Sequence, residues 1–485
     1  MFSLSLFYIG KLGATMKHLS ALDALFLQLE TPETPMHVGS LMMLGGFGAR
    51  KDPYKVIRAH IEKRVHLAPV FSRVVKFMPL DLASPLWIDA PRMDLDYHIR
   101  HLTLAKPGTQ AQLENAVAKL HEGVLDRERP LWQFTVIDGL KSGEVGFYAK
   151  IHHAALDGQG GIAVAQALLD TERKPRATPA PQASAGRLPP SASRMLASAL
   201  RNTVAQYGRI LKAVPGVAKA AGRAGAVTLS SGESRKRGIS LAPRNRLNAA
   251  ICAERLFVAT QIPLAEAKAI ARAFDAKLND VVLATCAGAL RKLFADDKGA
   301  LVKSMVGAVP LSLRAPGDTT QENQVSMMLV SLATHVADPV KRMEAIRSAS
   351  TRAKMLAGSV KGAIPTDLPS LGIPWLMAAI TPLYRKAVAA PRIPVIANLV
   401  ISNVPGPQAT LYLAGAELKA YYPVSIVTHG LALNVTIVSY DGSLDFGLVA
   451  CKRTVPDLRS FAKHLTSAHK ELLKAAQKTD RMEKR

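Results

Sequence analysis

Cysteine is scarce in this chain of 485 residues, which contains only Cys252, Cys286 and Cys451. The three lie far apart in the sequence, are odd in number and form no CxxC motif. Such a pattern argues against a disulfide framework and against a zinc site, and it is typical of a reducing compartment. We therefore expect no bound metal and no network of disulfides.

The sequence also lacks a convincing membrane span and a convincing signal peptide. The longest uncharged run in its C-terminal half, residues 368–384, is interrupted by three prolines, whereas a transmembrane helix needs about 20 apolar residues. Residues 1–15 have no basic residue ahead of their short apolar run, unlike a secretory signal. We predict a cytoplasmic protein that is not secreted and has no transmembrane helix. Because a globular pattern begins at Met16, residues 1–15 are a candidate upstream extension, and the choice between Met1 and Met16 as the start stays open.

Aromatic residues are few, and acidic residues are fewer than basic ones. Aromatics make up 5% of the chain, and 62 Lys and Arg against 37 Asp and Glu give a net charge of +25. This charge indicates an anionic partner, but no nucleic-acid-binding motif accompanies it. An anionic membrane or a CoA-like anion is therefore favoured over nucleic acid.

The length and the local patterns predict two lobes joined by a linker. A chain of this size exceeds what one hydrophobic core usually supports, and helix-like and strand-like patterns alternate in both halves, which indicates mixed α/β lobes. Residues 171–250 differ, because they are rich in Pro, Ala and Gly and carry 15 Lys or Arg against two acidic residues. We expect an N-terminal lobe over residues 16–170, a basic linker with some helix over 171–250, and a C-terminal lobe over 251–485.

One short stretch in the first lobe carries a candidate for chemistry. A strand-like run, uncharged over residues 145–148 and continuing through residues 149–151, ends in His152 and His153, and Asp157 and Gly158 follow before the next helical pattern begins. A tight turn there would present an imidazole rigidly, and a histidine can accept a proton from a hydroxyl near neutral pH. The alternative is a buried histidine pair satisfied by the backbone, with Asp157 as a helix N-cap.

The heptapeptide HHAALDG matches HHxxxDG, the signature of the CoA-dependent acyltransferase superfamily, which includes chloramphenicol acetyltransferase and peptide-synthetase condensation domains. From Met16 to about Lys470 the chain resembles the bacterial wax ester synthase/acyl-CoA:diacylglycerol acyltransferase family. The matching blocks are LSALDALFLQLETPETPMHVGSL, RPLWQFTVIDGL, LNDVVLATCAGALR, VPLSLR, ISNVPGP and LNVTIVSYDGSLDFGL. The resemblance implies two chloramphenicol-acetyltransferase-like lobes with the active-site tunnel between them.

The resemblance also implies roles for single residues. His153 would be the general base, Asp157 the structural support of the site, and Asn279 a donor to the substrate or the oxyanion. The remaining candidates for substrate binding are His152, Gly158, Trp132, Asp280, Arg314 and Asn403.

For most of these candidates a purely structural role is the alternative to substrate binding. His152 would then support the turn, and Trp132 would belong to the core. Asn279 or Asp280 would cap the helix that follows, and Asn403 would belong to a turn after a strand. Arg314 is a candidate partner for Asp157 or for the CoA phosphates.

The function implied is transfer of a long-chain acyl group from acyl-CoA, as co-substrate, to diacylglycerol or a long-chain alcohol, forming triacylglycerol or wax ester. No permanently bound cofactor and no nucleic acid are expected. The insoluble acceptor and the basic linker predict peripheral attachment to an anionic membrane or a lipid-inclusion surface. The alternatives are an acyltransferase for another lipid or polyketide alcohol, and a catalytically weak lipid-inclusion-binding protein. The acceptor preference, the chain length and the oligomeric state stay open.

Overall fold

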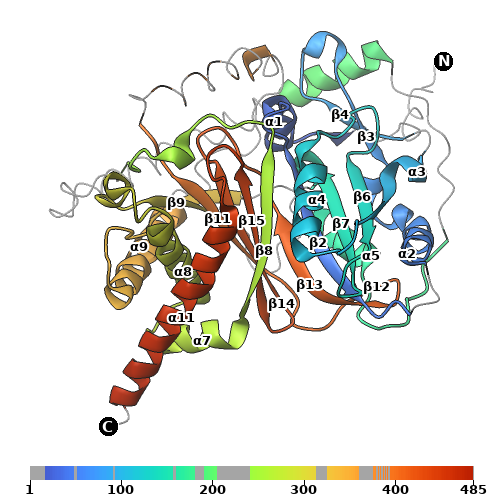
Figure 1. Ribbon diagram of the computed structural model, residues 1–485. Helices are drawn as coiled ribbons and strands as arrows, with labels where there is room; N and C mark the ends of the chain where they lie inside the picture. The colour runs from blue at the N-terminus through green and yellow to red at the C-terminus, as the bar shows by residue number, and fades with distance from the viewer. Residues whose placement is uncertain are drawn as a thin grey trace, which may run out of the picture.

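A computed structural model shows two lobes side by side, each built on a six-stranded sheet (Figure 1). It describes residues 17–48, 52–90, 93–156, 160–180, 191–204, 241–312, 325–359 and 394–483, together with 375–377, 381, 383, 386, 388 and 390. The mixed α/β architecture predicted from the sequence is confirmed. None of the helices in these ranges has the length and apolar character needed to span a membrane.

The sheet of the first lobe has the strand order β12-β13-β2-β7-β6-β5. Its strands are β2 (His37–Gly45), β5 (Ile99–Thr103), β6 (Trp132–Asp138), β7 (Val145–His152), β12 (Tyr412–Leu413) and β13 (Ala416–Val424). The helices of this lobe are α1 (Ala21–Leu29), α2 (Pro53–Glu62), α3 (Leu95–His98), α4 (Gln110–Glu122) and α5 (Gly160–Leu168). A small sheet of β1 (Lys17–His18), β4 (Leu86–Asp89) and β3 (Arg73–Lys76) lies beside it.

Strand β7 is a central strand, paired antiparallel with β2 on one side and β6 on the other. Every residue of it is buried, which explains its nearly uninterrupted apolar sequence, because both faces of this strand are covered. The strand therefore forms a fixed platform that ends at His152.

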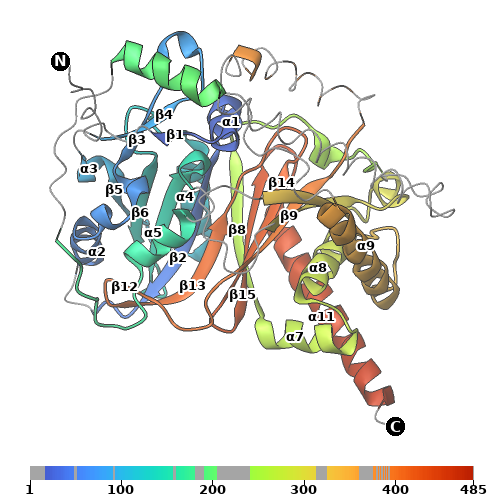
Figure 2. The same cartoon turned by 180° about the vertical axis from the view of Figure 1, so that it is seen from behind.

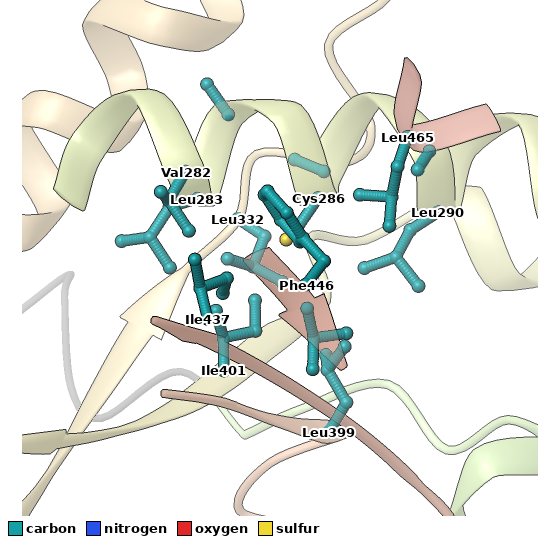
Figure 3. Close-up of a cluster of buried hydrophobic side chains, with 14 of the residues drawn as sticks. Val282, Leu283, Cys286, Leu290, Leu332, Leu399, Ile401, Ile437, Phe446 and Leu465 are labelled. Atoms are coloured by element: carbon teal, nitrogen blue, oxygen red, sulfur yellow. The ribbon is translucent and has the colours of Figure 1, made fainter. Parts of the chain in front are cut away.

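The second lobe has the strand order β10-β9-β11-β14-β15-β8. Its strands are β8 (Arg255–Pro263), β9 (Val306–Ser312), β10 (Val325–Ser331), β11 (Leu399–Pro405), β14 (Leu433–Tyr440) and β15 (Ser443–Cys451). The helices α7 (Leu264–Ala273), α8 (Leu278–Leu293), α9 (Pro339–Ser359) and α11 (Leu458–Glu483) gather beside it (Figure 2). Figure 3 shows the core between α8 and the sheet, where Leu283, Cys286 and Phe446 are fully buried.

The two lobes share strands, which the sequence did not predict. Strands β12 and β13 come from the second half of the chain but complete the first sheet, and β13 pairs with β2 along residues 417–424. Residues 251–485 thus do not all belong to the second lobe. A strand pattern indicates that a segment is extended, but it does not identify a partner almost 400 residues away in the chain.

Strand β15 of the second sheet packs directly on β13 of the first. At Gly447 an added Cβ would lie 1.6 Å from the carbonyl oxygen of Pro423, so only glycine fits there. Two residues earlier, the buried carboxylate of Asp445 accepts a hydrogen bond of 2.7 Å from the backbone N–H of Tyr421. These contacts bind the two sheets together.

Helix α4 of the first lobe covers the exposed edge of the second sheet. Strand β8 is an edge strand, and its N–H groups at Arg255 and Ala259 donate to Glu122 and Glu114, at 3.0 and 3.2 Å. Burial raises the pKa of Glu114, whose other oxygen lies 2.8 Å from Arg459 of α11. Satisfied edge N–H groups cannot pair with another strand, so the carboxylates both close the edge and join the lobes.

Two of the three cysteines meet in space although they are 199 residues apart. The Sγ atoms of Cys252 and Cys451 are 3.2 Å apart, and both residues are free thiols. They meet because Cys451 lies opposite Arg255, where β15 ends beside the start of β8. Cys286 lies apart in the core, and burial raises the pKa of its thiol to about 12.

Replacing Gly447 with alanine should destabilise the protein, because the new methyl group overlaps the carbonyl of Pro423. We expect Gly447→Ala to lower the free energy of unfolding by about 3 kcal/mol, as for other overpacked sites. Gly123→Ala is the control, since its Cβ would meet nothing within 4 Å, and its effect should stay within about 0.5 kcal/mol. Equal denaturant midpoints for the two variants would contradict the packing argument.

Candidate active site

His153 lies where β7 ends and the 3-10 turn His153–Ala155 begins. Its backbone N–H donates to the carbonyl of Met36 at 2.8 Å, just before β2. Its imidazole stacks on the ring of Phe26 in α1, with centroids 4.0 Å apart and an interplanar angle of 21°. The residue is thus fixed by two contacts, one through its backbone and one through its ring, with segments that the sequence pattern did not associate with it.

Burial lowers the pKa of the His153 imidazole to about 4, partly opposed by the residue's own backbone carbonyl. Nδ1 is buried and makes no hydrogen bond among the described residues. With a pKa of about 4 the ring is neutral at pH 7.

His152 has a different role, because both of its ring nitrogens face the protein. Its side chain is fully buried, and Nδ1 accepts from the N–H of Ala154 at 3.1 Å. The proton must then lie on Nε2, which is 3.3 Å from Oε1 of Glu30. The backbone N–H of His152 donates to Leu131 at 2.9 Å. This arrangement supports the turn and leaves no nitrogen of His152 for a substrate.

Glu30, directly after α1, collects the contacts that fix this turn. Its side chain is 3% exposed. Oε1 accepts from the N–H of Met36 at 2.9 Å, and Oε2 lies 3.0 Å from Arg127. Burial alone would raise the pKa of Glu30, but the interactions with His152, Met36 and Arg127 outweigh it and hold the pKa below its usual value. The carboxylate therefore stays ionised beside His152.

Sequence reasoning missed Glu30, Phe26 and Arg127, because each contacts the histidine turn only in the folded protein. Glu30 stands in the block LQLETPETPMH, between a helical pattern and a strand pattern. A lone acidic residue at a helix end is common, so the sequence contains no local signal for it. The burial of its carboxylate is what identifies it.

Trp132 is part of the scaffold beneath the turn. It opens β6 opposite Ile151, is fully buried and donates from its indole N–H to the carbonyl of Phe71 at 3.0 Å. Its ring stacks on His98, with centroids 4.2 Å apart. This placement favours a structural role over contact with a substrate.

The Asn279–Asp280 pair lies in the first turn of α8. Asp280 is buried and accepts from the N–H of Lys277 at 3.0 Å, so it closes the start of the helix. Asn279 is half-buried beside it. Across the described residues no hydrogen bond, ion pair or ring contact joins either residue to His153, and a donor role for Asn279 stays a prediction.

The other predicted residues are placed only in part. Asn403 lies half-buried in β11, opposite Ile437 of β14. Asp157, Gly158 and Arg314 lie outside the described residues.

Two further features do not add to this site. Within the described ranges no three His, Cys, Asp or Glu side chains gather as a metal site. A pocket of about 430 Å³ lies at the Val145 end of β7, and the strand separates it from His153.

Comparison with known proteins places the chain in one family. The wax ester synthase/diacylglycerol acyltransferase catalytic domain matches residues 19–282, and the C-terminal domain of that family matches 321–473. A Mycobacterium tuberculosis protein described as a diacylglycerol O-acyltransferase is 34% identical over 466 residues, which are 94% of this chain and 99% of that protein. A second from the same organism is 32% identical over 462 residues, which cover 93% and 98%.

Solved structures agree with these matches. The wax ester synthase/diacylglycerol acyltransferase from Marinobacter aquaeolei superposes with a TM-score of 0.67 at 28% identity, covering 95% of this chain and 100% of that one. The starter condensation domain of rhizomide synthetase superposes with a TM-score of 0.53 at 14% identity, covering 95% of each chain. This second likeness concerns the fold alone.

The lowered pKa of His153 predicts an unusual pH dependence. A base with a pKa of about 4 stays neutral far below the usual histidine range, so kcat/KM should be nearly flat from about pH 5 to 8 and fall only near pH 4. A pH–rate profile with a soluble acceptor, with circular dichroism to confirm folding at each pH, measures this. An acid limb centred near pH 6.5 would contradict the lowered pKa of His153.

Removing the charge of Glu30 should weaken both the turn and the fold. We expect Glu30→Gln to lower kcat by about tenfold or more and the free energy of unfolding at pH 7 by about 2 kcal/mol, since a largely buried ion pair is broken. The pKa of Glu30 is depressed in the folded state, so its stabilisation is complete above its unfolded pKa and is lost as the pH falls through its folded pKa.

The difference between wild type and Glu30→Gln should therefore shrink in acid. Urea unfolding at pH 7 and at about pH 4 measures it. Glu128→Gln, in an exposed position, is the control and should match wild type. A Glu30→Gln variant with wild-type stability and kcat would show that the carboxylate does not position the turn.

Proposed function

The chain belongs to the wax ester synthase/diacylglycerol acyltransferase family, and on that premise we propose how it works. It is an acyltransferase that transfers an acyl group to diacylglycerol or a long-chain alcohol, forming triacylglycerol or wax ester. The proposal adds that acyl-CoA with a long chain is the donor and that His153 is the general base. The observation that carries it is the neutral, immobilised imidazole at the end of β7.

The reaction needs one base and no enzyme-bound acyl group. Nε2 of His153 takes the proton of the acceptor hydroxyl while its oxygen attacks the thioester carbonyl, giving a tetrahedral oxyanion. The oxyanion collapses, the C–S bond breaks, and the CoA thiolate takes the proton back from His153. The products are the new ester and free CoA, and the histidine returns to its neutral form.

The cysteines support direct transfer over a covalent intermediate. Nucleophilic catalysis would place a serine or cysteine within hydrogen-bond reach of the base. In the part of the chain that the structure describes, no hydroxyl or thiol hydrogen-bonds to His153. Cys286 is in the core with a pKa of about 12, and Cys252 and Cys451 contact each other.

The proposal also assigns roles to three further residues and a place to each substrate. Asp157 supports the turn from its far end, with Arg314 as its partner or as a contact to the CoA phosphates. Asn279 donates to the substrate or the oxyanion from the start of α8. The donor and the acceptor meet in a tunnel between the lobes, next to the strands that the lobes share, and the protein attaches peripherally to an anionic lipid surface.

Replacing the base tests the proposal. With palmitoyl-CoA and either hexadecanol or diolein, His153→Ala should lower kcat by about 100-fold or more, because the hydroxyl loses its proton acceptor. Lipid products and free CoA are quantified together, so that hydrolysis is not counted as transfer. His101→Ala, a partly exposed histidine paired with Asp138, is the control. A folded His153→Ala enzyme that keeps more than about a tenth of kcat would refute the assignment.

A further inference from the structure

Three segments far apart in the sequence expose large apolar side chains beside one another. They are the turn between β3 and β4, the helix formed by residues 192–204, and the short helical segment at Trp375 (Figures 1 and 2). Both views show them together, at the end of the molecule that carries α1. We call the exposed apolar residues of these segments the docking face: Phe77, Leu80, Leu196, Leu200, Val204, Trp375 and Leu376.

The turn between β3 and β4 projects its apolar tip into solvent. Leu80 is 81% exposed and has a φ of 55°. A leucine rarely occupies this left-handed region, because its side chain crowds the backbone there. The fold therefore holds an unfavourable conformation in which an apolar side chain faces water.

The helix at residues 192–204 has two apolar faces. Met195 and Ala199 are buried against the β3–β4 turn, which anchors the helix. Leu196, Leu200 and Val204 follow at intervals of four residues, so they share one face of the helix. They are exposed, Val204 to 72%. A helix on a water-facing surface normally places polar residues on this side.

The third segment is joined to the first. The indole N–H of Trp375 donates to the carbonyl of Leu80 at 3.0 Å, while the side chain stays 55% exposed. Leu376 beside it is 51% exposed. An indole with its N–H bound and its ring in solvent is typical of side chains at a membrane interface.

The surrounding charge indicates what covers this face. Arg194 and Arg201 are exposed on the same helix, which contains no acidic residue, and Lys76 is exposed at the end of β3, against Asp81 in the turn. Apolar side chains bordered by arginine and lysine match a phospholipid surface, whose interior is apolar and whose headgroups are anionic. A protein partner would need no such combination.

The docking face is continuous with the active site. The ring of Phe77 lies 5.9 Å from the guanidinium of Arg127, which pairs with Glu30 beside His152. Beneath the face, Val75 of β3 packs in one apolar cluster with Ala154 of the histidine turn. Direct packing thus links the docking face to the histidine turn.

We propose that the docking face binds an anionic phospholipid surface and receives the lipid acceptor from it. The second half of this statement rests on the proposed function, whereas the binding itself does not.

Vesicle flotation tests the binding, with vesicles of phosphatidylcholine and phosphatidylglycerol that contain diolein. The double variant Leu80→Asp/Val204→Asp should weaken partitioning by about tenfold or more, because two side chains that would enter the apolar layer become charged. The matched control is Val302→Asp/Met355→Asp in the second lobe, where Val302 is 72% exposed, like Val204, and Met355 is 63% exposed. The control should float like wild type.

Several outcomes would overturn the proposal. One is flotation of the folded docking-face variant equal to that of wild type, and another is equal loss in the control. A third is a wild-type dimer by light scattering that the docking-face variant converts to monomer, because the face would then bind a second copy of the chain.

A spectroscopic measurement places the contact directly. Phosphatidylcholine brominated on its acyl chains should quench the tryptophan fluorescence of the wild type, and Trp375→Phe should remove most of this quenching. The other two tryptophans, the fully buried Trp132 and the half-buried Trp87 of β4, are unchanged in the variant and set the residual quenching. Unchanged quenching in Trp375→Phe would show that Trp375 does not enter the acyl layer, against the proposal.

Activity assays separate this proposal from the catalytic one. The docking-face variant should keep wild-type kcat with a short, water-soluble alcohol and lose about tenfold in rate with diolein in vesicles. Loss of activity with the soluble alcohol as well would show that the substitutions disturb the site rather than the docking. Vesicle binding by His153→Ala should be unchanged, whatever the outcome of its activity assay.

Discussion

The carboxylate of Glu30 is the contact on which the geometry of the site depends. A buried carboxylate remains ionised only where several donors reach it. Here the donors come from the start of β2, from the segment after α4 and from the end of β7, through Met36, Arg127 and His152. These elements therefore cannot shift independently. The backbone of His153 is bound to Met36 and its ring lies on Phe26 of α1. His153 is therefore fixed together with these elements.

The sharing of strands between the lobes likewise prevents them from moving independently. Strands β12 and β13 belong to the second half of the chain yet complete the first sheet, and Gly447 lets β15 approach β13 to a distance that no larger residue permits. Glu114 and Glu122 close the edge of β8 from the first lobe. Lobes joined in three ways do not separate easily, so the two sheets keep a fixed arrangement relative to each other.

The sequence predicted those features of the fold and the site that neighbouring residues determine. The apolar run of β7, its termination at His152 and His153, and the helix from Leu278 each depend on neighbouring residues, and each was predicted. The pairing of β13 with β2, the meeting of Cys252 with Cys451 and the role of Glu30 depend on long-range packing. Nothing in their local sequence distinguishes them from an ordinary strand, an isolated thiol or a helix-end acid.

Desolvation gives His153 its lowered pKa, although the residue as a whole is only half-buried. A desolvated base is effective only if the hydroxyl arrives without bulk water, because water at the thioester would hydrolyse it. Diacylglycerol and fatty alcohols dissolve in lipid and hardly in water. Phe77 of the docking face contacts Arg127, which pairs with Glu30 beside the histidine turn, so the proposed lipid surface would lie near the site. On the proposed mechanism, the acceptor would then reach His153 from a lipid surface rather than from bulk water.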